Sequence, residues 1–145
     1  MEITEVRVRL VRSEDDPLKA FCSMTLDNEF VVRDIKVIQG AHGYFVAMPS
    51  RKMGSRCARC GGKNYLGARF CNGCGASLPP NRVKKDPNGR AKLHADVAHP
   101  ISAGCRRQIQ EALIGAYEQE LRRSKLPDYR PIEDELDDNA LDATR

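Results

Sequence analysis

The amino-acid sequence predicts an α+β protein with a small cysteine-rich module inserted into it. Four consecutive short segments alternate apolar and polar residues or are rich in β-branched ones, and a later segment has apolar residues at helical spacing. In between, four of the six cysteines form two Cys-x-x-Cys pairs. We therefore expect an antiparallel four-stranded sheet with a C-terminal helix packed on it, plus the inserted module.

The first two strands are predicted from alternation. In residues 3–11, Val6, Val8 and Leu10 alternate with arginines, which is the pattern of a strand with one buried face. After a turn at residues 13–17 that contains two aspartates and a proline, residues 18–26 continue the alternation. The two segments are expected to pair as a hairpin.

The third and fourth strands are predicted from composition and turn signals. Residues 30–38 are rich in β-branched side chains, although Val31, Ile35 and Ile38 also fit one face of a helix. The strand prediction therefore depends on propensity and on the glycine at position 40. A turn at residues 39–43 and a short strand at residues 44–48, stopped by a proline, would complete the sheet.

One helix is expected after the module. Ser102 is a good N-cap residue, and Pro127 is expected to end the helix. Its apolar positions would face the sheet and are Ile109, Leu113, Ala116, Tyr117 and Leu121. Residues 126–145 are acidic and nearly free of aromatic residues, so we expect a disordered tail there.

The paired cysteines predict a metal centre. Ten residues separate the two pairs, enough for a hairpin to close a tetrahedral site, and a glycine follows each second cysteine, where a tight turn needs positive φ. The candidate ligands are Cys57, Cys60, Cys71 and Cys74. We expect one structural Zn²⁺ per chain, because four sulfurs leave no position open for water or substrate. A rubredoxin-like iron centre and disulfides are the alternatives.

The remaining features indicate a reducing compartment. Cys22 and Cys105 lie in apolar surroundings and are expected to be small buried hydrophobes rather than a disulfide. The chain has no run of 18 apolar residues, and strand-like residues begin directly at its N-terminus. We therefore expect a cytoplasmic protein without membrane contact, with association with the nucleoid as a further option.

The net charge of +4 is unevenly distributed. Residues 1–50 carry 6 Lys and Arg against 8 Asp and Glu, residues 51–107 carry 13 against 2, and residues 108–145 carry 5 against 10. Such a basic middle segment favours phosphate neutralisation over a merely solvated surface. Ten candidate nucleic-acid-binding cations lie in residues 51–92, namely Arg51, Lys52, Arg56, Arg59, Lys63, Arg69, Lys84, Lys85, Arg90 and Lys92.

Two aromatic residues of the module have two interpretations. Tyr65 and Phe70 could stack on nucleic-acid bases, or they could form the module's miniature core. For Phe70 the core interpretation is preferred. For Tyr65, at the tip of the loop between the cysteine pairs, both remain open.

The sequence does not predict an enzyme. It contains no Ser/His/Asp order, no glycine-rich phosphate loop and no acid pair at a useful spacing. His42 and His94 are loop residues without evident partners, and His99 is expected to make a structural hydrogen bond. A metal-dependent nuclease is the weakest alternative.

The first fifty residues closely resemble the stage V sporulation protein G (SpoVG) family. The resemblance is clearest in residues 19–22, 25–27, 30–38 and 45–50, which read KAFC, TLD, FVVRDIKVI and FVAMPS. It resumes at residues 98–101, which read AHPI, and in the following helix, so that it covers roughly residues 1–52 and 84–123. Where the family has a short basic stretch, this chain inserts a segment that resembles the small zinc ribbons appended to many bacterial proteins.

The resemblance implies a dimeric nucleic-acid-binding regulator that acts on DNA, RNA or both. In the family, basic residues after the Met-Pro-Ser segment are associated with binding; here these are Arg51 and Lys52 and, after the insertion, Lys84 and Lys85. The expected domains are residues 1–52 and 82–125, with the ribbon at 53–81 and the tail at 126–145. A regulatory adaptor whose ribbon docks an acidic protein partner is the alternative.

Overall fold

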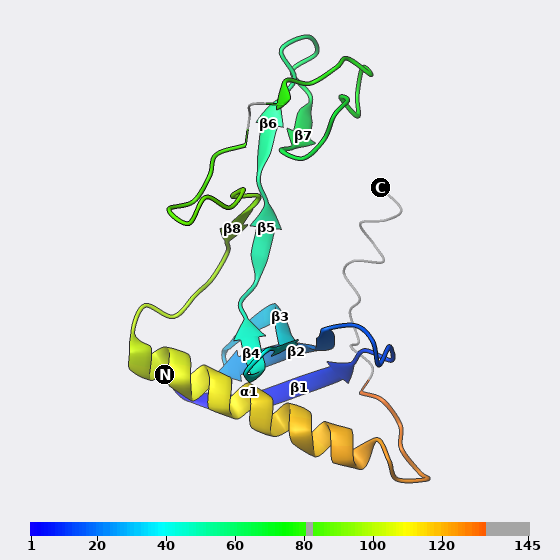
Figure 1. Cartoon of the computed structure of the whole chain (residues 1–145). Coiled ribbons are helices and arrows are strands. Elements are labelled where there is room, and N and C mark those ends of the chain that lie inside the picture. The colour runs from blue at the N-terminus through cyan, green and yellow to red at the C-terminus, as the bar shows by residue number, and fades with distance from the viewer. Residues whose placement is uncertain (81–82, 133–145) are drawn as a thin grey trace. The chain divides into compact units, whose positions relative to one another are not determined.

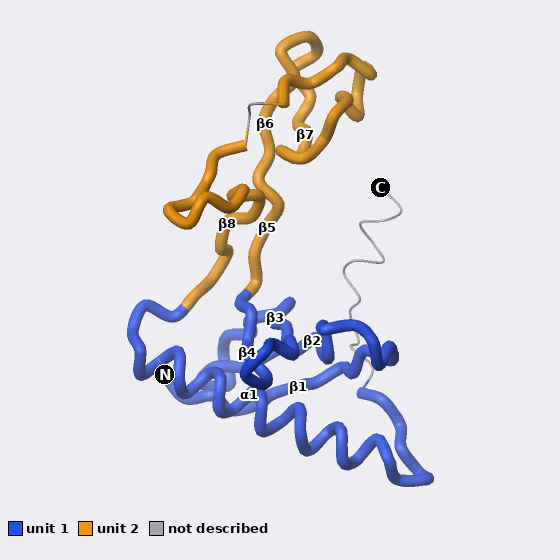
Figure 2. Tube along the Cα trace, viewed as in Figure 1, with its two compact units in different colours: residues 1–48, 100–145 blue, residues 49–99 orange. Residues whose placement is uncertain are grey.

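The computed structural model describes residues 1–80 and 83–132 (Figure 1). It divides into two compact units, one formed by Met1–Met48 with Pro100–Arg145 and the other by Pro49–His99 (Figure 2). Most of the predicted disordered tail, residues 133–145, lies outside the described residues.

The first unit contains an antiparallel sheet and one long helix. The strands are β1 (Ile3–Leu10), β2 (Leu18–Leu26), β3 (Phe30–Gly40) and β4 (Gly43–Ala47), in the spatial order β1-β2-β3-β4. The helix α1 (Ala103–Arg123) packs on one face of this sheet. The predicted α+β fold with four antiparallel strands and a C-terminal helix is thus confirmed.

The core lies between the apolar side of α1 and one face of the sheet. Alternate residues of β2, together with Ile35 and Val37 of β3, belong to one core cluster with buried residues of α1. The buried core residues are Val8, Ala20, Cys22, Met24, Ile35, Val37, Ile109, Leu113 and Tyr117. Burial raises the pKa of the Cys22 thiol to about 12, so this cysteine behaves as a small apolar side chain, as predicted.

The third strand contains a bulge, which separates the residues that could have shared a helical face. The register with β2 shifts between the pairs Cys22–Ile35 and Met24–Val32. At this point Asp34 has a φ of 58°, in the left-handed region. Ile35 is buried while Val31 is 45% exposed, so the helical interpretation of this segment does not apply.

The helix begins as predicted but ends earlier. The Ser102 hydroxyl accepts a hydrogen bond from the Cys105 backbone N–H at 3.1 Å, which is an N-cap. The helix ends at Arg123, short of Pro127, and beyond it the Tyr129 hydroxyl donates to Glu120 at 2.8 Å. The start of the predicted tail therefore contacts the helix.

The second unit is built from two short strand pairs. β5 (Ser50–Lys52) pairs with β8 (His94–Asp96), and β6 (Gly54–Arg56) pairs with β7 (Lys63–Tyr65). The limits of this unit, 49 and 99, differ from the limits of 53 and 81 expected for the ribbon. A compact unit is not the same as a domain that folds on its own, so the predicted domain limits stay a prediction. Among the described residues, no helix combines the length and apolarity that a membrane span requires.

Candidate metal centre and nucleic-acid interface

Two similar turns present the cysteines. The Gly61 N–H donates to the Cys57 carbonyl at 2.9 Å, and the Gly75 N–H donates to the Cys71 carbonyl at 3.0 Å. Gly61 and Gly75 have φ of 74° and 75°, in the region that favours glycine. The glycine after each second cysteine therefore has the conformational role that the sequence predicted.

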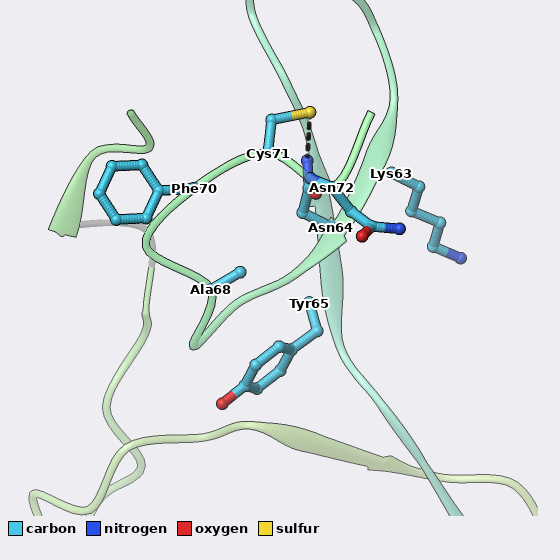
Figure 3. A pocket seen from close by; sticks show the side chains of 7 residues that line it. All are labelled: Lys63, Asn64, Tyr65, Ala68, Phe70, Cys71 and Asn72. Carbon is cyan, nitrogen blue, oxygen red and sulfur yellow. Dashed lines mark hydrogen bonds between the residues drawn. The ribbon is translucent and has the colours of Figure 1, made fainter. Parts of the chain in front are cut away.

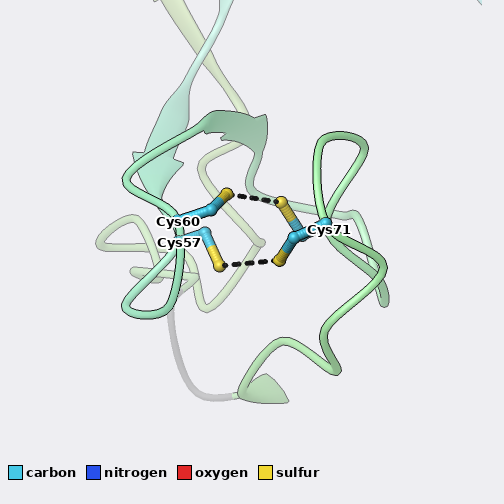
Figure 4. A group of neighbouring side chains, drawn as sticks. Cys57, Cys60 and Cys71 are labelled. Carbon is cyan, nitrogen blue, oxygen red and sulfur yellow. Dashed lines mark hydrogen bonds between the residues drawn. The ribbon is translucent and has the colours of Figure 1, made fainter.

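The four sulfur atoms converge on one point. They all lie within 4.8 Å of one another, and Figure 4 shows the sulfurs of Cys57, Cys60 and Cys71 facing a common centre. The Sγ atoms of Cys57 and Cys74 are 3.8 Å apart, and those of Cys60 and Cys71 are 3.5 Å apart. Sulfurs bound tetrahedrally at about 2.3 Å would be about 3.8 Å apart. The cysteines are therefore close enough to hold a metal ion.

Backbone N–H groups of the turns point at the sulfurs. Donation to a sulfur favours its thiolate form, which is the form that binds metal. The donors and acceptors are Arg59 N–H to Cys57 at 3.4 Å, Gly62 N–H to Cys60 at 3.3 Å and Gly73 N–H to Cys71 at 3.3 Å. Each turn thus supplies partial positive charge to the ligands that it carries.

The pKa values of two of the thiols are shifted in opposite directions. A backbone N–H of Cys74 and the side-chain amide of Asn64 lower the pKa of Cys71 to about 6. The Ala76 N–H acts in the same direction on Cys74, yet burial and the three other cysteine sulfurs raise the pKa of Cys74 to about 11. A bound divalent ion would offset the mutual repulsion of four thiolates at this site.

Asn64 is a part of the site that the sequence analysis missed. Its side chain is buried, its amide N–H donates to the Cys71 Sγ at 3.4 Å, and its Oδ1 accepts from the Asn72 backbone N–H at 2.8 Å. These bonds tie β7 to the second cysteine turn. Only the strand geometry reveals this role, because in the sequence Asn64 is one polar residue among others between the cysteine pairs.

The interior of the cysteine module, residues 53–80, contains no aromatic ring. Leu66 and Leu78 are buried, and Leu78 packs with Cys57 and Cys71. Phe70 is 64% exposed, so the preferred prediction that it forms the module's core is wrong. Two leucines and the cysteine side chains fill the small interior, which leaves no room for a ring.

All ten candidate cations are exposed. In the second unit, the chain segments that carry these cations form backbone pairings in two places. Lys52 on β5 pairs with His94 on β8. Separately, the Lys92 backbone N–H donates a hydrogen bond to the Lys84 carbonyl at 2.8 Å. One of the ten is partly engaged, since Arg56 donates to the Gly61 carbonyl at 3.1 Å.

One cation from β5 lies against the cysteine module. The Lys52 Nζ is 5.1 Å from the centroid of the Tyr65 ring. Tyr65 is 44% exposed on β7. The segment after the Met-Pro-Ser sequence and the loop between the cysteine pairs therefore meet at these two side chains.

The fold and the site together define a small α+β protein that carries a four-cysteine site able to hold a metal ion. The family model for SpoVG matches residues 1–119. A protein of Clostridium kluyveri named "Putative septation protein SpoVG" is 40% identical over 118 residues, covering 81% of this chain and 84% of the relative. The chain therefore belongs to the SpoVG family.

Other relatives carry similar names. A protein of Finegoldia magna with the same name is 34% identical over 135 residues, covering 93% of this chain and 91% of the relative. A protein numbered SpoVG 1 from Listeria monocytogenes is 39% identical over 118 residues, covering 81% of this chain and 79% of the relative. The names of these relatives associate them with septation.

Proposed function

We propose that this chain is a regulatory protein that binds nucleic acid through the ten candidate cations named above, which lie in residues 51–92. The observation that carries the proposal is the exposed and unbalanced charge of the second unit, whose only acidic residues are Asp86 and Asp96. The Asp86 carboxylate accepts from the N–H groups of Asn88 and Arg90, both at 2.9 Å, and so is used within its own turn. Phosphates are the anions that such a surface suits.

Zinc is the metal that we propose for the four-cysteine site. Four thiolates in a tetrahedral arrangement suit Zn²⁺ or iron, and neither has an open coordination position there, so the ion would be structural. The module has few buried apolar residues, and metal binding to such modules contributes roughly 10–16 kcal/mol of apparent folding free energy. The ion would therefore hold the surface that carries Arg59, Lys63 and Arg69.

The proposed protein acts by binding and not by catalysis, as a homodimer. Within the described residues, β1 and β4 each have one edge without a strand partner, and unpaired edges favour association.

A regulatory adaptor that docks an acidic protein is the second candidate, because the same cations would attract carboxylates.

A salt titration tests the proposal. On duplex DNA each neutralised phosphate contributes a slope of about −0.9 in log affinity against log salt, and about −0.7 on single strands. Arg51→Ala/Lys52→Ala should weaken binding and flatten the slope by roughly 1.5–2 units. The matched control is Arg106→Ala/Arg107→Ala, which removes two adjacent exposed cations of α1 and should leave the slope unchanged.

A second pair in the titration separates the two candidate functions. Arg59→Ala/Lys63→Ala removes two exposed cations of the cysteine module. If this pair leaves affinity and slope unchanged while the Arg51/Lys52 pair reduces both, the module docks a protein. Absence of salt-dependent binding by the wild type to DNA and RNA would overturn the proposed function as a whole.

A further inference from the structure

The cysteine module displays two aromatic rings beside an open pocket (Figure 3). Tyr65 is 44% exposed and Phe70 is 64% exposed. The pocket has a volume of about 560 Å³, and its lining consists of the two rings with Lys63, Asn64, Ala68, Cys71 and Asn72. In Figure 3 the two rings lie on either side of the Ala68 methyl group.

The exposure of these rings is not explained by folding. The module buries Leu66 and Leu78 in its interior and leaves the larger aromatic side chains in water. Burying a Phe side chain contributes about 1.5–3 kcal/mol, which this module forgoes. Exposed apolar groups that are gathered at one place and rimmed by polar residues are typical of binding sites.

The turn beside the pocket leaves room for one of the rings. A Cβ at Gly67 would collide with the phenol group of Tyr65. The Ala68 N–H donates to the Tyr65 carbonyl at 3.0 Å, which closes the turn. Glycine at this position therefore lets the Tyr65 ring lie over the turn at the surface.

Cations accompany the rings. The Lys52 Nζ lies 5.1 Å from the centroid of Tyr65, and Lys63 lines the pocket. Neither lysine forms a salt bridge within the part of the chain that the structure describes. A surface that combines ring faces with nearby unpaired cations matches a ligand that combines flat bases with phosphates.

We propose that this pocket binds unpaired bases of single-stranded nucleic acid. The bases stack on Tyr65 and Phe70, and the phosphates that flank them contact Lys52 and Lys63. A duplex cannot use the rings in this way, because its base faces are covered by neighbouring base pairs. The inference rests on the proposed function and specifies the form of nucleic acid that the cysteine module selects.

The test compares three labelled ligands of about 12 nucleotides, within the usual range of single-strand sites. These are oligothymidine, an abasic strand with the same phosphates, and a duplex, each titrated by fluorescence anisotropy with the zinc-loaded full chain. The variant is Tyr65→Ala/Phe70→Ala. The matched control is Phe30→Ala/Leu126→Ala, which removes two side chains of the first unit that are 65% and 59% exposed.

The expected loss is specific to bases. The ring variant should bind oligothymidine about 5- to 150-fold more weakly for each ring that stacks, with its abasic and duplex affinities and its salt slope unchanged. Tyr65→Phe/Phe70→Tyr should keep the affinity. If the alanine variant loses its metal, Tyr65→Leu/Phe70→Leu keeps apolar bulk without rings and should give the same loss.

The other outcomes overturn the inference or the proposed function separately. Equal binding of oligothymidine and the abasic strand by the wild type, or equal losses on oligothymidine and duplex in the ring variant, would overturn base stacking while leaving nucleic-acid binding intact. If the ring variant loses binding only to an acidic polypeptide such as polyglutamate, the pocket is a protein-docking site. No binding of any of the three ligands by the wild type would instead overturn the proposed function.

Discussion

The side-chain amide of Asn64 donates a hydrogen bond to the Sγ of Cys71 at 3.4 Å, from a position where Asn64 is 5% exposed. The same amide donates to the Gly62 carbonyl at 3.3 Å. One neutral side chain thus contacts both cysteine turns. Its position fixes the sulfur of Cys71 and stabilises its thiolate without adding charge.

Replacing Asn64 should weaken metal binding without removing a ligand. Asn64→Asp places a carboxylate beside a thiolate, and Asn64→Ala removes the donor, so either should lower zinc affinity about 10- to 100-fold. Competition with a chromophoric chelator measures the change. Asn72→Ala is the control, because Asn72 takes part through its backbone N–H. Unchanged affinity in both Asn64 variants would show that the amide bond has no role in metal retention.

Removing a ligand should unfold the cysteine module but not the sheet. Cys71→Ser should abolish stoichiometric zinc uptake, because the site depends on four sulfurs. Amide signals of β6 and β7 should lose dispersion in two-dimensional NMR spectra, while those of β1 to β4 persist. Cys105→Ser changes a cysteine outside the cluster and should keep one metal per chain. A full metal equivalent in Cys71→Ser would refute the ligand assignment.

The sheet and helix could be predicted because their signals are local. Val6, Val8 and Leu10 show the period of a strand within a few residues, and Ser102 marks the helix start by itself. The β5–β8 pair joins two strands of three residues across more than 40 intervening positions, and its sequence carries no alternation long enough to recognise. Non-local pairing of this kind is visible only in three dimensions.

The candidate site was likewise predictable only where its signal is local in the sequence. Spacing identifies the cysteine ligands, because the chemistry requires it. The exposure of Phe70 could not be derived, because it depends on which side chains fill the interior, and Leu66 and Leu78 fill it. The contact between Tyr129 and Glu120, nine positions apart, likewise could not be derived from the sequence.

Glu120 should give the helix end a pH-dependent stability. Hydrogen bonds from Arg123 at 3.0 and 2.8 Å, with a bond from Tyr129, hold the pKa of Glu120 below its ordinary value. A lowered folded-state pKa contributes stability that is present above the ordinary value of 4.5 and is lost as the pH falls through the folded-state pKa. Because Arg123 is 44% exposed, Glu120→Gln should cost only about 1 kcal/mol at neutral pH.

Urea unfolding followed by circular dichroism of the helix measures this cost. The difference between wild type and Glu120→Gln should shrink as the pH falls from the ordinary value of 4.5 through the lowered folded-state pKa of Glu120, below which both side chains are neutral. Glu118→Gln removes an exposed carboxylate two residues away and serves as the control. A difference that does not begin to shrink as the pH falls below 4.5 would mean that the ionised form of Glu120 contributes nothing.

The face of the sheet opposite α1 leads to a prediction about assembly. Phe45 and Val31 are 43% and 45% exposed there, and Phe45 covers Gly40, where a Cβ would meet the ring at 3.0 Å. Arg9 lies 5.2 Å from the centroid of the Phe21 ring. Phe45 lies on β4, which has one edge without a strand partner within the described residues, and an exposed ring beside an open edge favours a second copy of the chain as its partner.

Light scattering at micromolar concentration should therefore give about twice the chain mass of 16.2 kDa. Phe45→Glu places a charge in the expected interface and should shift the protein towards the monomer, because an unpaired charge is costly to bury. Leu126→Glu adds the same charge at a 59% exposed site beyond the helix and should leave the dimer intact. A wild type that is monomeric at this concentration would contradict the homodimer, and a Phe45→Glu protein that stays dimeric would place the interface at the strand edges instead of the open face.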